Sequence, residues 1–238
     1  MYEAYRAAGG NFVDTADKYT GGASEQIVGQ LIASEDDQIV LATKYSLTAD
    51  PDDPNGGGTH RKRLVHALDA SLKRLGTDYI DLYSQHAWDY LTPTEEVMRA
   101  LDDQLRTGKI LYVGVSDTPA WIISRANAIA ELRTWTPFVS LQIQYSLVER
   151  TVERDLIPMA RSLDLAVTAW GPLGSGLLSG KYTRAATPQP TDASTLRAES
   201  RALASKSSQS PRRFTMLQMN YKPLLLLSRS PGYSTSRT

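Results

Sequence analysis

Four polar residues that are far apart along the chain combine side-chain types that could protonate a carbonyl oxygen. They are Asp14, Tyr19, Lys44 and His86. A tyrosine hydroxyl is a weak acid at neutral pH, and a neighbouring lysine cation favours its ionised form and makes it a better proton donor. An aspartate could hold the lysine, and a histidine could orient the carbonyl and share in the proton transfer. These four types therefore indicate a general-acid centre.

Each of these residues also has an ordinary structural explanation. Asp14 could cap a turn, and Tyr19 could be a buried aromatic side chain. Lys44 could be a surface cation at the end of a strand, and a single histidine such as His86 is more often structural than catalytic. Taken one at a time, the residue types leave the structural and the catalytic interpretations open.

The pattern around these residues alternates short apolar strands with helices. We predict strands at residues 11–14, 38–44, 79–84, 110–115, 138–143 and 166–170. We predict helices at residues 2–8, 60–75, 94–106, 119–133 and 152–163, with a further helix capped by Ser24. Such alternation indicates parallel βαβ units, and the apolar strands indicate burial on both faces. Two architectures stay open, a doubly wound sheet and a (β/α) barrel.

The candidate residues share one position in this pattern, because each lies at or just after the end of a predicted strand. Three later strands carry further polar or aromatic residues at the same point: Ser116 and Asp117, then Gln142 and Tyr145, then Trp170. In a parallel barrel, these strand ends all point to one face, where active sites are built. Trp170 taken alone would more often be a core side chain.

The composition is that of a globular protein. The chain has 238 residues, and 41% of them are hydrophobic. This length is just below the roughly 250 residues of a (β/α)₈ barrel. It contains no cysteine, so disulfides and thiolate metal sites are excluded, and we predict no metal site. No apolar run approaches the ~18 residues needed to span a bilayer, and no secretory leader is recognised. We expect a cytoplasmic protein that binds neither membrane nor nucleic acid.

The last quarter of the chain differs from the rest. Residues 184–238 hold nine Lys/Arg and two Asp/Glu, whereas the preceding residues hold 17 and 24. This segment is rich in Ser, Thr, Arg and Pro and lacks a period of 2 or 3.6, which is typical of disorder. We therefore predict a folded domain over residues 1–183 and a disordered tail over residues 184–238.

Several stretches, in this order and spacing, resemble the aldo-keto reductase family over about three quarters of the chain. They are residues 10–19 (GNFVDTADKY), 24–29, 41–44 (LATK), 75–83 (LGTDYIDLY) leading to His86, 108–110, and 113–116 (VGVS). Some details resemble the potassium-channel β-subunit and bacterial general reductase branches of that family more than the aldose reductase branch. The resemblance implies a (β/α)₈ TIM barrel, and it places Tyr19, Asp14, Lys44 and His86 at the family's catalytic positions.

The resemblance also implies NADPH bound across the carboxyl-terminal face of the barrel. Ser116, Asp117 and Gln142 would hold the nicotinamide carboxamide, and Trp170 would stack on the nicotinamide ring. Asp117 stands where the family has Asn, and a carboxylate can accept but not donate a hydrogen bond. The residues expected to wrap the pyrophosphate are Gly171, Pro172, Leu173, Ser175 and Gly176. Such a glycine-rich stretch could also be an ordinary loop.

The family pattern is incomplete in this sequence. We recognise the family's strands two to seven, but neither the first and eighth strands nor the segment that grips the adenosine 2′-phosphate. We therefore expect an incomplete barrel from a truncated or frame-shifted chain, with open sheet edges that favour self-association. The predicted activity is NADPH-dependent reduction of a small-molecule aldehyde or ketone. The alternative is an inactive, truncated barrel that binds nucleotide or acts as an interaction protein.

Overall fold

The computed structural model describes residues 1–48 and 52–180, and the chain divides into two compact units. The first unit, Met1–Pro172, contains all of the described strands and α-helices. The second begins at Leu173, and its described part holds one 3-10 helix, Leu177–Ser179. The tail predicted for residues 184–238 lies outside the described residues and stays a prediction.

The first unit is built on one parallel sheet. Its strands are β1 (Phe12–Asp14), β2 (Val40–Tyr45), β3 (Ile80–Gln85), β4 (Ile110–Ser116), β5 (Ser140–Gln144) and β6 (Ala166–Trp170). They lie in the sheet in the same order as in the chain, and each described neighbouring pair is parallel. A doubly wound sheet would instead reverse its strand order near the middle. The sheet is therefore a half-barrel of the (β/α) type, which decides between the two predicted architectures.

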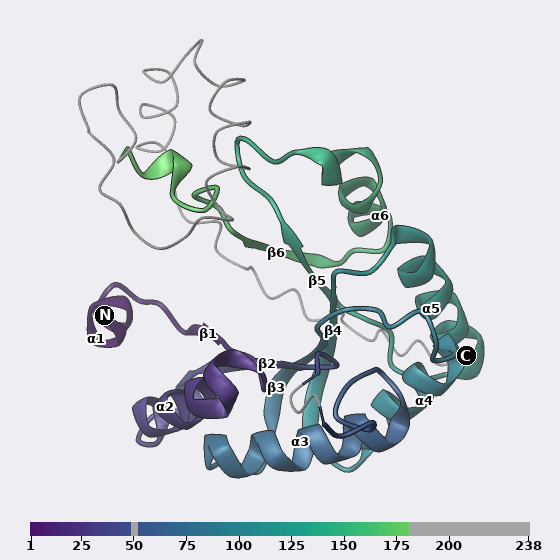
Figure 1. Cartoon of the computed structure of the whole chain (residues 1–238), viewed down its shortest axis with the longest axis horizontal. Helices are drawn as coiled ribbons and strands as arrows, with labels where there is room; N and C mark the ends of the chain where they lie inside the picture. Colours follow the sequence, from purple (N-terminus) through teal and green to yellow (C-terminus); the bar gives the residue numbers. More distant parts are fainter. Residues whose placement is uncertain (49–51, 181–238) are drawn as a thin grey trace, which may run out of the picture. The chain divides into compact units, whose positions relative to one another are not determined.

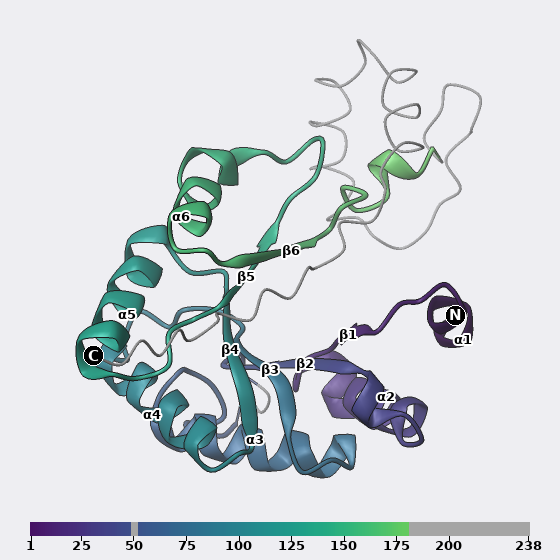
Figure 2. The same cartoon turned by 180° about the vertical axis from the view of Figure 1, so that it is seen from behind.

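The helices of the first unit follow the outer side of this sheet. They are α1 (Tyr2–Ala7), α2 (Ala23–Ile32), α3 (Arg61–Leu75), α4 (Thr94–Arg106), α5 (Ala120–Arg133) and α6 (Leu156–Ser162). Figure 1 shows α2 to α6 in an arc along one face of the strands, and Figure 2 shows the same arc from behind. Within residues 1–48 and 52–180, no helix is long and apolar enough to cross a membrane.

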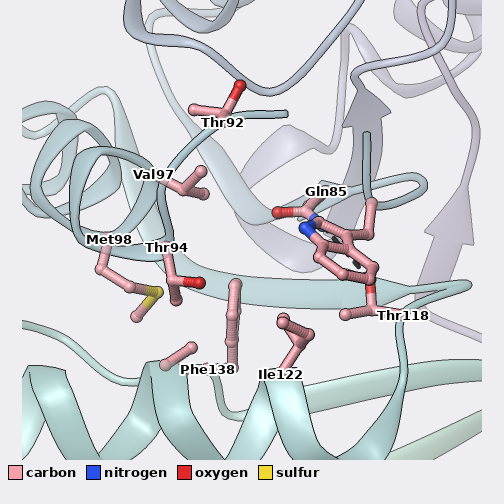
Figure 3. A pocket seen from close by; sticks show the side chains of 10 residues that line it. Gln85, Thr92, Thr94, Val97, Met98, Thr118, Ile122 and Phe138 are labelled. Atoms are coloured by element: carbon pink, nitrogen blue, oxygen red, sulfur yellow. Dashed lines mark hydrogen bonds between the residues drawn. The ribbon is translucent and has the colours of Figure 1, made fainter. Parts of the chain in front are cut away.

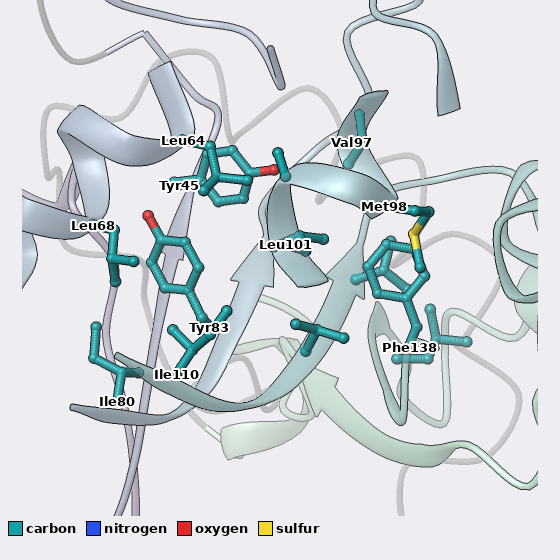
Figure 4. Close-up of a cluster of buried hydrophobic side chains, with 14 of the residues drawn as sticks. Tyr45, Leu64, Leu68, Ile80, Tyr83, Val97, Met98, Leu101, Ile110 and Phe138 are labelled. Atoms are coloured by element: carbon teal, nitrogen blue, oxygen red, sulfur yellow. The ribbon is translucent and has the colours of Figure 1, made fainter. Parts of the chain in front are cut away.

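The hydrophobic core lies between the sheet and these helices. Tyr45 and Tyr83 stack there with ring centroids 5.1 Å apart, next to Leu64 and Leu68 of α3 (Figure 4). Side chains alternate between the two faces of a strand. Because Tyr45 faces the core, its neighbour Lys44 faces the opposite, concave side, as does Ser84, which pairs with it. The core side of β2 and β3 thus fixes which residues point into the half-barrel.

The sheet is not buried on both faces as the apolar strands indicated. Tyr112 of β4 and Trp170 of β6 lie on the concave face and are 57% and 41% exposed. Their exposure follows from the half-barrel, because the helices α2 to α6 lie on the other face. The concave face is open where a site for a small molecule is expected.

Three local predictions are corrected by the structure. The helix predicted at 152–163 is two elements, a 3-10 helix (Thr151–Arg154) and α6, because Asp155 leaves helical geometry and accepts from the Leu156 amide. Ser24 does not cap α2, which begins one residue earlier; its hydroxyl lies 2.8 Å from the Thr15 hydroxyl. His60, predicted as the first residue of the helix at 60–75, instead caps α3 by accepting from the Arg63 amide.

Gly29 allows α2 to pack directly on the end of α3. A Cβ atom at this position would lie 2.2 Å from the carbonyl oxygen of Leu75, and backbone cannot move aside cheaply. We expect Gly29→Ala to destabilise the fold by about 1–3 kcal/mol, the usual cost of overpacking. Urea unfolding of this variant and of Gln30→Ala, an exposed neighbour on α2, measures the difference. Equal unfolding midpoints would show that the helices separate without cost.

Candidate active site

Lys44 is the buried centre of the site. Near the end of β2 its side chain is only 1% exposed, and its Nζ donates to Asp14 Oδ2 at 2.6 Å and to the Thr15 carbonyl at 2.7 Å. Parallel pairing of β1 with β2 brings these groups together, with Asp14 in register with Ala42. Burial of an ammonium group is costly unless it is paired and hydrogen-bonded. The Asp14 carboxylate and the Thr15 carbonyl meet this requirement.

Tyr19 lies beside the lysine in the turn that follows β1. Its ring centroid is 5.1 Å from Lys44 Nζ, and the residue is 40% exposed. Thr20 and Gly21 have φ values of 52° and 62°, so the chain turns sharply away just after the tyrosine. Among the described residues, the Tyr19 hydroxyl has no hydrogen-bond partner. The hydroxyl is therefore available to a molecule on the concave face.

His86 completes the group from the end of β3. Its backbone amide donates to the Tyr45 carbonyl at 2.8 Å, and its ring meets the Tyr19 ring edge-on, with centroids 5.7 Å apart. Burial, followed by the nearby Lys44 and Lys18 cations, lowers the pKa of His86 to about 4. The imidazole is therefore neutral at neutral pH, with one nitrogen that donates and one that accepts.

The residues predicted to hold a nicotinamide lie on the same concave face. Ser116 at the end of β4 pairs in register with Gln142 of β5, and Gln142 Nε2 donates to Asp14 Oδ1 at 3.2 Å. Burial raises the pKa of the Asp117 carboxyl, and the nearby Trp170 side chain opposes this effect. Gln142 thus contacts Asp14, and Trp170 lies near Asp117.

The geometry agrees with what comparison with known proteins shows. A family model described as "Aldo/keto reductase family" matches residues 1–224. The chain belongs to the aldo/keto reductase family. The fold and family expected from the sequence are thereby confirmed, while the placement in particular branches stays a prediction.

Three fungal relatives show which named proteins this chain is similar to. It is 44% identical to the norsolorinic acid reductase of Aspergillus flavus over 183 residues, which cover 74% of the chain and 47% of the relative. It is 39% identical to the aryl-alcohol dehydrogenase [NADP(+)] of Phanerodontia chrysosporium over 186 residues, 74% and 48% of the two chains. It is 40% identical to a probable aryl-alcohol dehydrogenase of Saccharomyces cerevisiae over 189 residues, 76% and 57%. The chain spans about half the length of these relatives.

The glycine-rich stretch of this chain falls on the boundary between the two units. Gly171 and Pro172 end the first unit, whereas Leu173, Ser175 and Gly176 belong to the second. Positive φ values recur at Gly171, Gly174, Ser175 and Gly176. The Gly176 amide donates to the Leu173 carbonyl at 3.1 Å and the Leu177 amide to the Gly174 carbonyl at 3.0 Å, so this stretch forms tight turns. Its predicted role in wrapping the pyrophosphate stays a prediction.

Asp89 is a structural residue of the site that the sequence analysis missed. It lies three residues after His86, and its carboxylate accepts from Thr59 (N, 2.7 Å; Oγ1, 2.8 Å), Thr92 (N, 2.9 Å; Oγ1, 2.6 Å) and the Leu91 amide at 3.0 Å. Burial raises the pKa of Asp89, but these hydrogen bonds outweigh it and hold the pKa well below its usual range. The Asp-x-x-Thr spacing was the available signal, since Asp side chains commonly bond the backbone that follows.

The depressed pKa of His86 predicts a loss of stability in acid. Between the ordinary value of 6.5 and the folded value of about 4, the unfolded chain binds more protons at His86 than the folded chain. Stability from this group is thus present above pH 6.5 and falls as the pH falls, by at most about 1.4 kcal/mol per pH unit. Unfolding free energies of the wild type and His86→Gln, each measured near pH 7.5 and near pH 5, test this. Parallel losses in the two proteins would contradict it, since the other titrating groups are common to both.

Proposed function

We propose that this chain catalyses reduction of an aldehyde or ketone to an alcohol, with NADPH as the reductant. The observation that carries the proposal is the meeting of four side chains from three strand ends. Lys44 is buried on Asp14, the Tyr19 ring lies 5.1 Å from Lys44 Nζ, and His86 packs edge-on against Tyr19. In this arrangement a proton donor, a fixed cation and a neutral imidazole border one open face.

Each residue has a separate part in the proposed reaction. Tyr19 donates its hydroxyl proton to the carbonyl oxygen as that oxygen gains negative charge. The Lys44 cation, held by Asp14, stabilises the phenolate that remains. The neutral His86 donates a hydrogen bond to the carbonyl oxygen and so orients it. When bound, NADPH supplies the hydride to the carbonyl carbon.

The described residues fit a nicotinamide at this face. Gln142 offers an amide group that contacts Asp14, Ser116 is in register with Gln142, and the Trp170 ring is partly exposed at the end of β6. Asp117 would accept from the carboxamide nitrogen rather than donate to the carboxamide oxygen, because an ionised carboxylate cannot donate. The choice of NADPH over NADH is supported by the relative named for NADP(+).

An aromatic carbonyl compound is the substrate class that we favour. Two of the relatives carry the name aryl-alcohol dehydrogenase. Trp88 lies two residues after His86. The centroid of its ring is 4.2 Å from that of Tyr90 and 5.6 Å from that of Trp121, which it meets edge-on. Tyr90 and Trp121 are largely exposed. Such rings attract a planar aromatic molecule through stacked or edge-on contacts.

A small pocket underlies this aromatic cluster. Trp88 lines it together with Gln85, Thr118 and Ile122, and Gln85 Nε2 donates to Thr118 Oγ1 at 3.2 Å (Figure 3). Trp88 therefore lies between the exposed rings and the packed ends of α4 and α5.

The test compares reduction of benzaldehyde with that of a short aliphatic aldehyde by the full chain and NADPH. We expect a higher kcat/KM for benzaldehyde, and Trp88→Ala should lower that value about 2- to 10-fold, the worth of one aromatic contact. Leu132→Ala, at a highly exposed position on α5, is the control and should leave kcat/KM for both aldehydes unchanged. Equal use of both aldehydes, unaffected by Trp88→Ala, would remove the case for an aromatic substrate and leave carbonyl reduction in place.

A further inference from the structure

A buried ion pair connects α3 with the turn that carries Tyr19. Arg63 Nη2, in the first turn of α3, donates to Asp17 Oδ2, and the two side chains are only 9% and 2% exposed. The Leu47 carbonyl is a second, longer acceptor at 3.4 Å. In the part of the chain that the structure describes, Asp17 Oδ1 and Arg63 Nε have no hydrogen-bond partner. The Arg63–Asp17 contact is therefore the main compensation for burying both charges.

Asp17 also holds the catalytic turn through its backbone. Its amide donates to the Lys44 carbonyl at 3.1 Å, and the Tyr19 amide donates to the Ala16 carbonyl at 3.1 Å. The residue thus joins three things: the strand end that bears Lys44, the turn that bears Tyr19, and helix α3 through Arg63. Tyr19 itself is partly exposed, so few contacts of its own fix its position.

Helix α3 is a rigid support for this connection. The Arg63 amide donates to His60 Nδ1 at 3.2 Å in the helix cap, and the adjacent Leu64 is completely buried in the core. The guanidinium group starts from a backbone that cannot shift without disturbing the core. Arg63 therefore provides a fixed attachment point for Asp17 and for the turn that follows it.

We propose that Arg63 is a positioning residue that acts through Asp17 to hold Tyr19 beside Lys44. This inference rests on the proposed function for the role given to Tyr19, but the placement of the turn stands apart from turnover. Neither Asp17 nor Arg63 touches the reacting group, so the pair is not catalytic.

Positioning explains the pair better than stability does. A buried ion pair usually gains little over apolar residues of the same size, because desolvation of the two charges offsets their attraction. What it adds is direction, since the buried Arg63 Nη2 donates to one particular carboxylate oxygen of Asp17, Oδ2. Burial raises the pKa of Asp17 to about 6 despite the opposing effect of Arg63, so the carboxyl is still mainly ionised at neutral pH. The pair thus operates where the enzyme would work.

The first test measures the turn without using activity. Amide hydrogen exchange of Asp17 and Tyr19 is compared in the wild type, Arg63→Gln, Arg63→Lys and Arg106→Gln, at a temperature where all are folded. Arg106→Gln is the matched control, because Arg106 pairs with Asp102, a carboxylate only 2% exposed on α4. We expect both amides to exchange at least about 10-fold faster in Arg63→Gln, an intermediate rate in Arg63→Lys, and no change in Arg106→Gln. Unchanged exchange in folded Arg63→Gln would overturn the proposal.

The second test uses the proposed activity. In Arg63→Gln, kcat should fall on the order of 10²-fold with little change in KM for NADPH, because a misplaced acid affects the chemical step rather than cofactor binding. Arg63→Lys should recover part of kcat, and Arg106→Gln should keep all of it. If Arg63→Gln fails to fold, both measurements are made on Arg63→Lys instead. Amide exchange rates and a kcat equal to those of the wild type in Arg63→Lys would refute the inference.

The two proposals fail separately. Suppose that the wild type has no reductase activity, but Arg63→Gln still speeds exchange at Asp17 and Tyr19. This result would reject the proposed function and support the role of Arg63 in placing the turn. An active wild type that loses turnover with Tyr19→Phe, but whose exchange and kcat ignore Arg63→Gln, would support the function and reject the role of Arg63.

Discussion

Tyr19→Phe is expected to lower kcat by about 10²–10⁴-fold, the usual contribution of a general acid, in a protein that still binds NADPH. The substitution removes only the hydroxyl group, and the ring keeps its edge-on contact with His86 and its place near Lys44. Because the described residues leave this hydroxyl without a hydrogen bond, the free energy of unfolding should change by less than about 0.5 kcal/mol. Steady-state NADPH oxidation with an aromatic aldehyde measures the loss.

Tyr112→Phe is the matched control for this change. Tyr112 is also an exposed tyrosine on the concave face, but it lies lower on the sheet, in register with Leu82. Its loss of a hydroxyl should leave kcat as in the wild type. If Tyr19→Phe kept wild-type turnover, another group would have to supply the proton and the assignment of the acid would be wrong.

We expect Lys44→Met to lower kcat by at least as large a factor as Tyr19→Phe does. Methionine has nearly the length of lysine and fits a buried position, but it provides no cation near Tyr19. Stability should fall by about 1–3 kcal/mol, because the Thr15 carbonyl loses its donor while Asp14, which is partly exposed, keeps its contact with Gln142. Activity assays and urea unfolding separate the large catalytic effect from the modest structural one.

His86 reports on the same substitution independently. The Lys44 cation is one of the causes that lower the pKa of His86, so the pKa of His86 should rise above about 4 in Lys44→Met. Lys109→Met, which removes a surface partner of Asp69, is the control and should leave the His86 titration unchanged. The titration of His86 is measured by NMR. If the pKa of His86 were the same in Lys44→Met as in the wild type, the Lys44 cation would have no electrostatic effect on His86.

The fold was largely predictable because its signals are local and repeated. The helix predicted at 94–106 and the strand predicted at 166–170 have the bounds of α4 and β6, and Gly76 ends α3 in the left-handed conformation expected of a C-terminal glycine. Barrel and doubly wound sheets share this local pattern, so the sequence pattern alone left the choice open. Strand order decided it, and strand order is a property of long-range pairing.

The candidate catalytic residues could be proposed from the sequence as a set, but their geometry could not. Asp14, Lys44 and His86 lie at strand ends, and parallel strands bring their ends to one edge. Asp17 and Arg63 could not be predicted to pair, because they are 46 residues apart and nothing in the helix pattern marks Arg63 as buried. His60 was likewise placed on the helix, whereas the cap depends on the backbone angles of one residue.

The measurement that tests the central claim most directly is the amount of product. The full chain is incubated with NADPH and benzaldehyde, and the alcohol formed and the NADPH oxidised are quantified beside a Tyr19→Phe sample. We predict equal amounts of alcohol and oxidised cofactor in the wild type, at a rate that Tyr19→Phe does not approach. A folded wild type that saturates with NADPH and yet forms no alcohol from any aldehyde tested would contradict the proposed function.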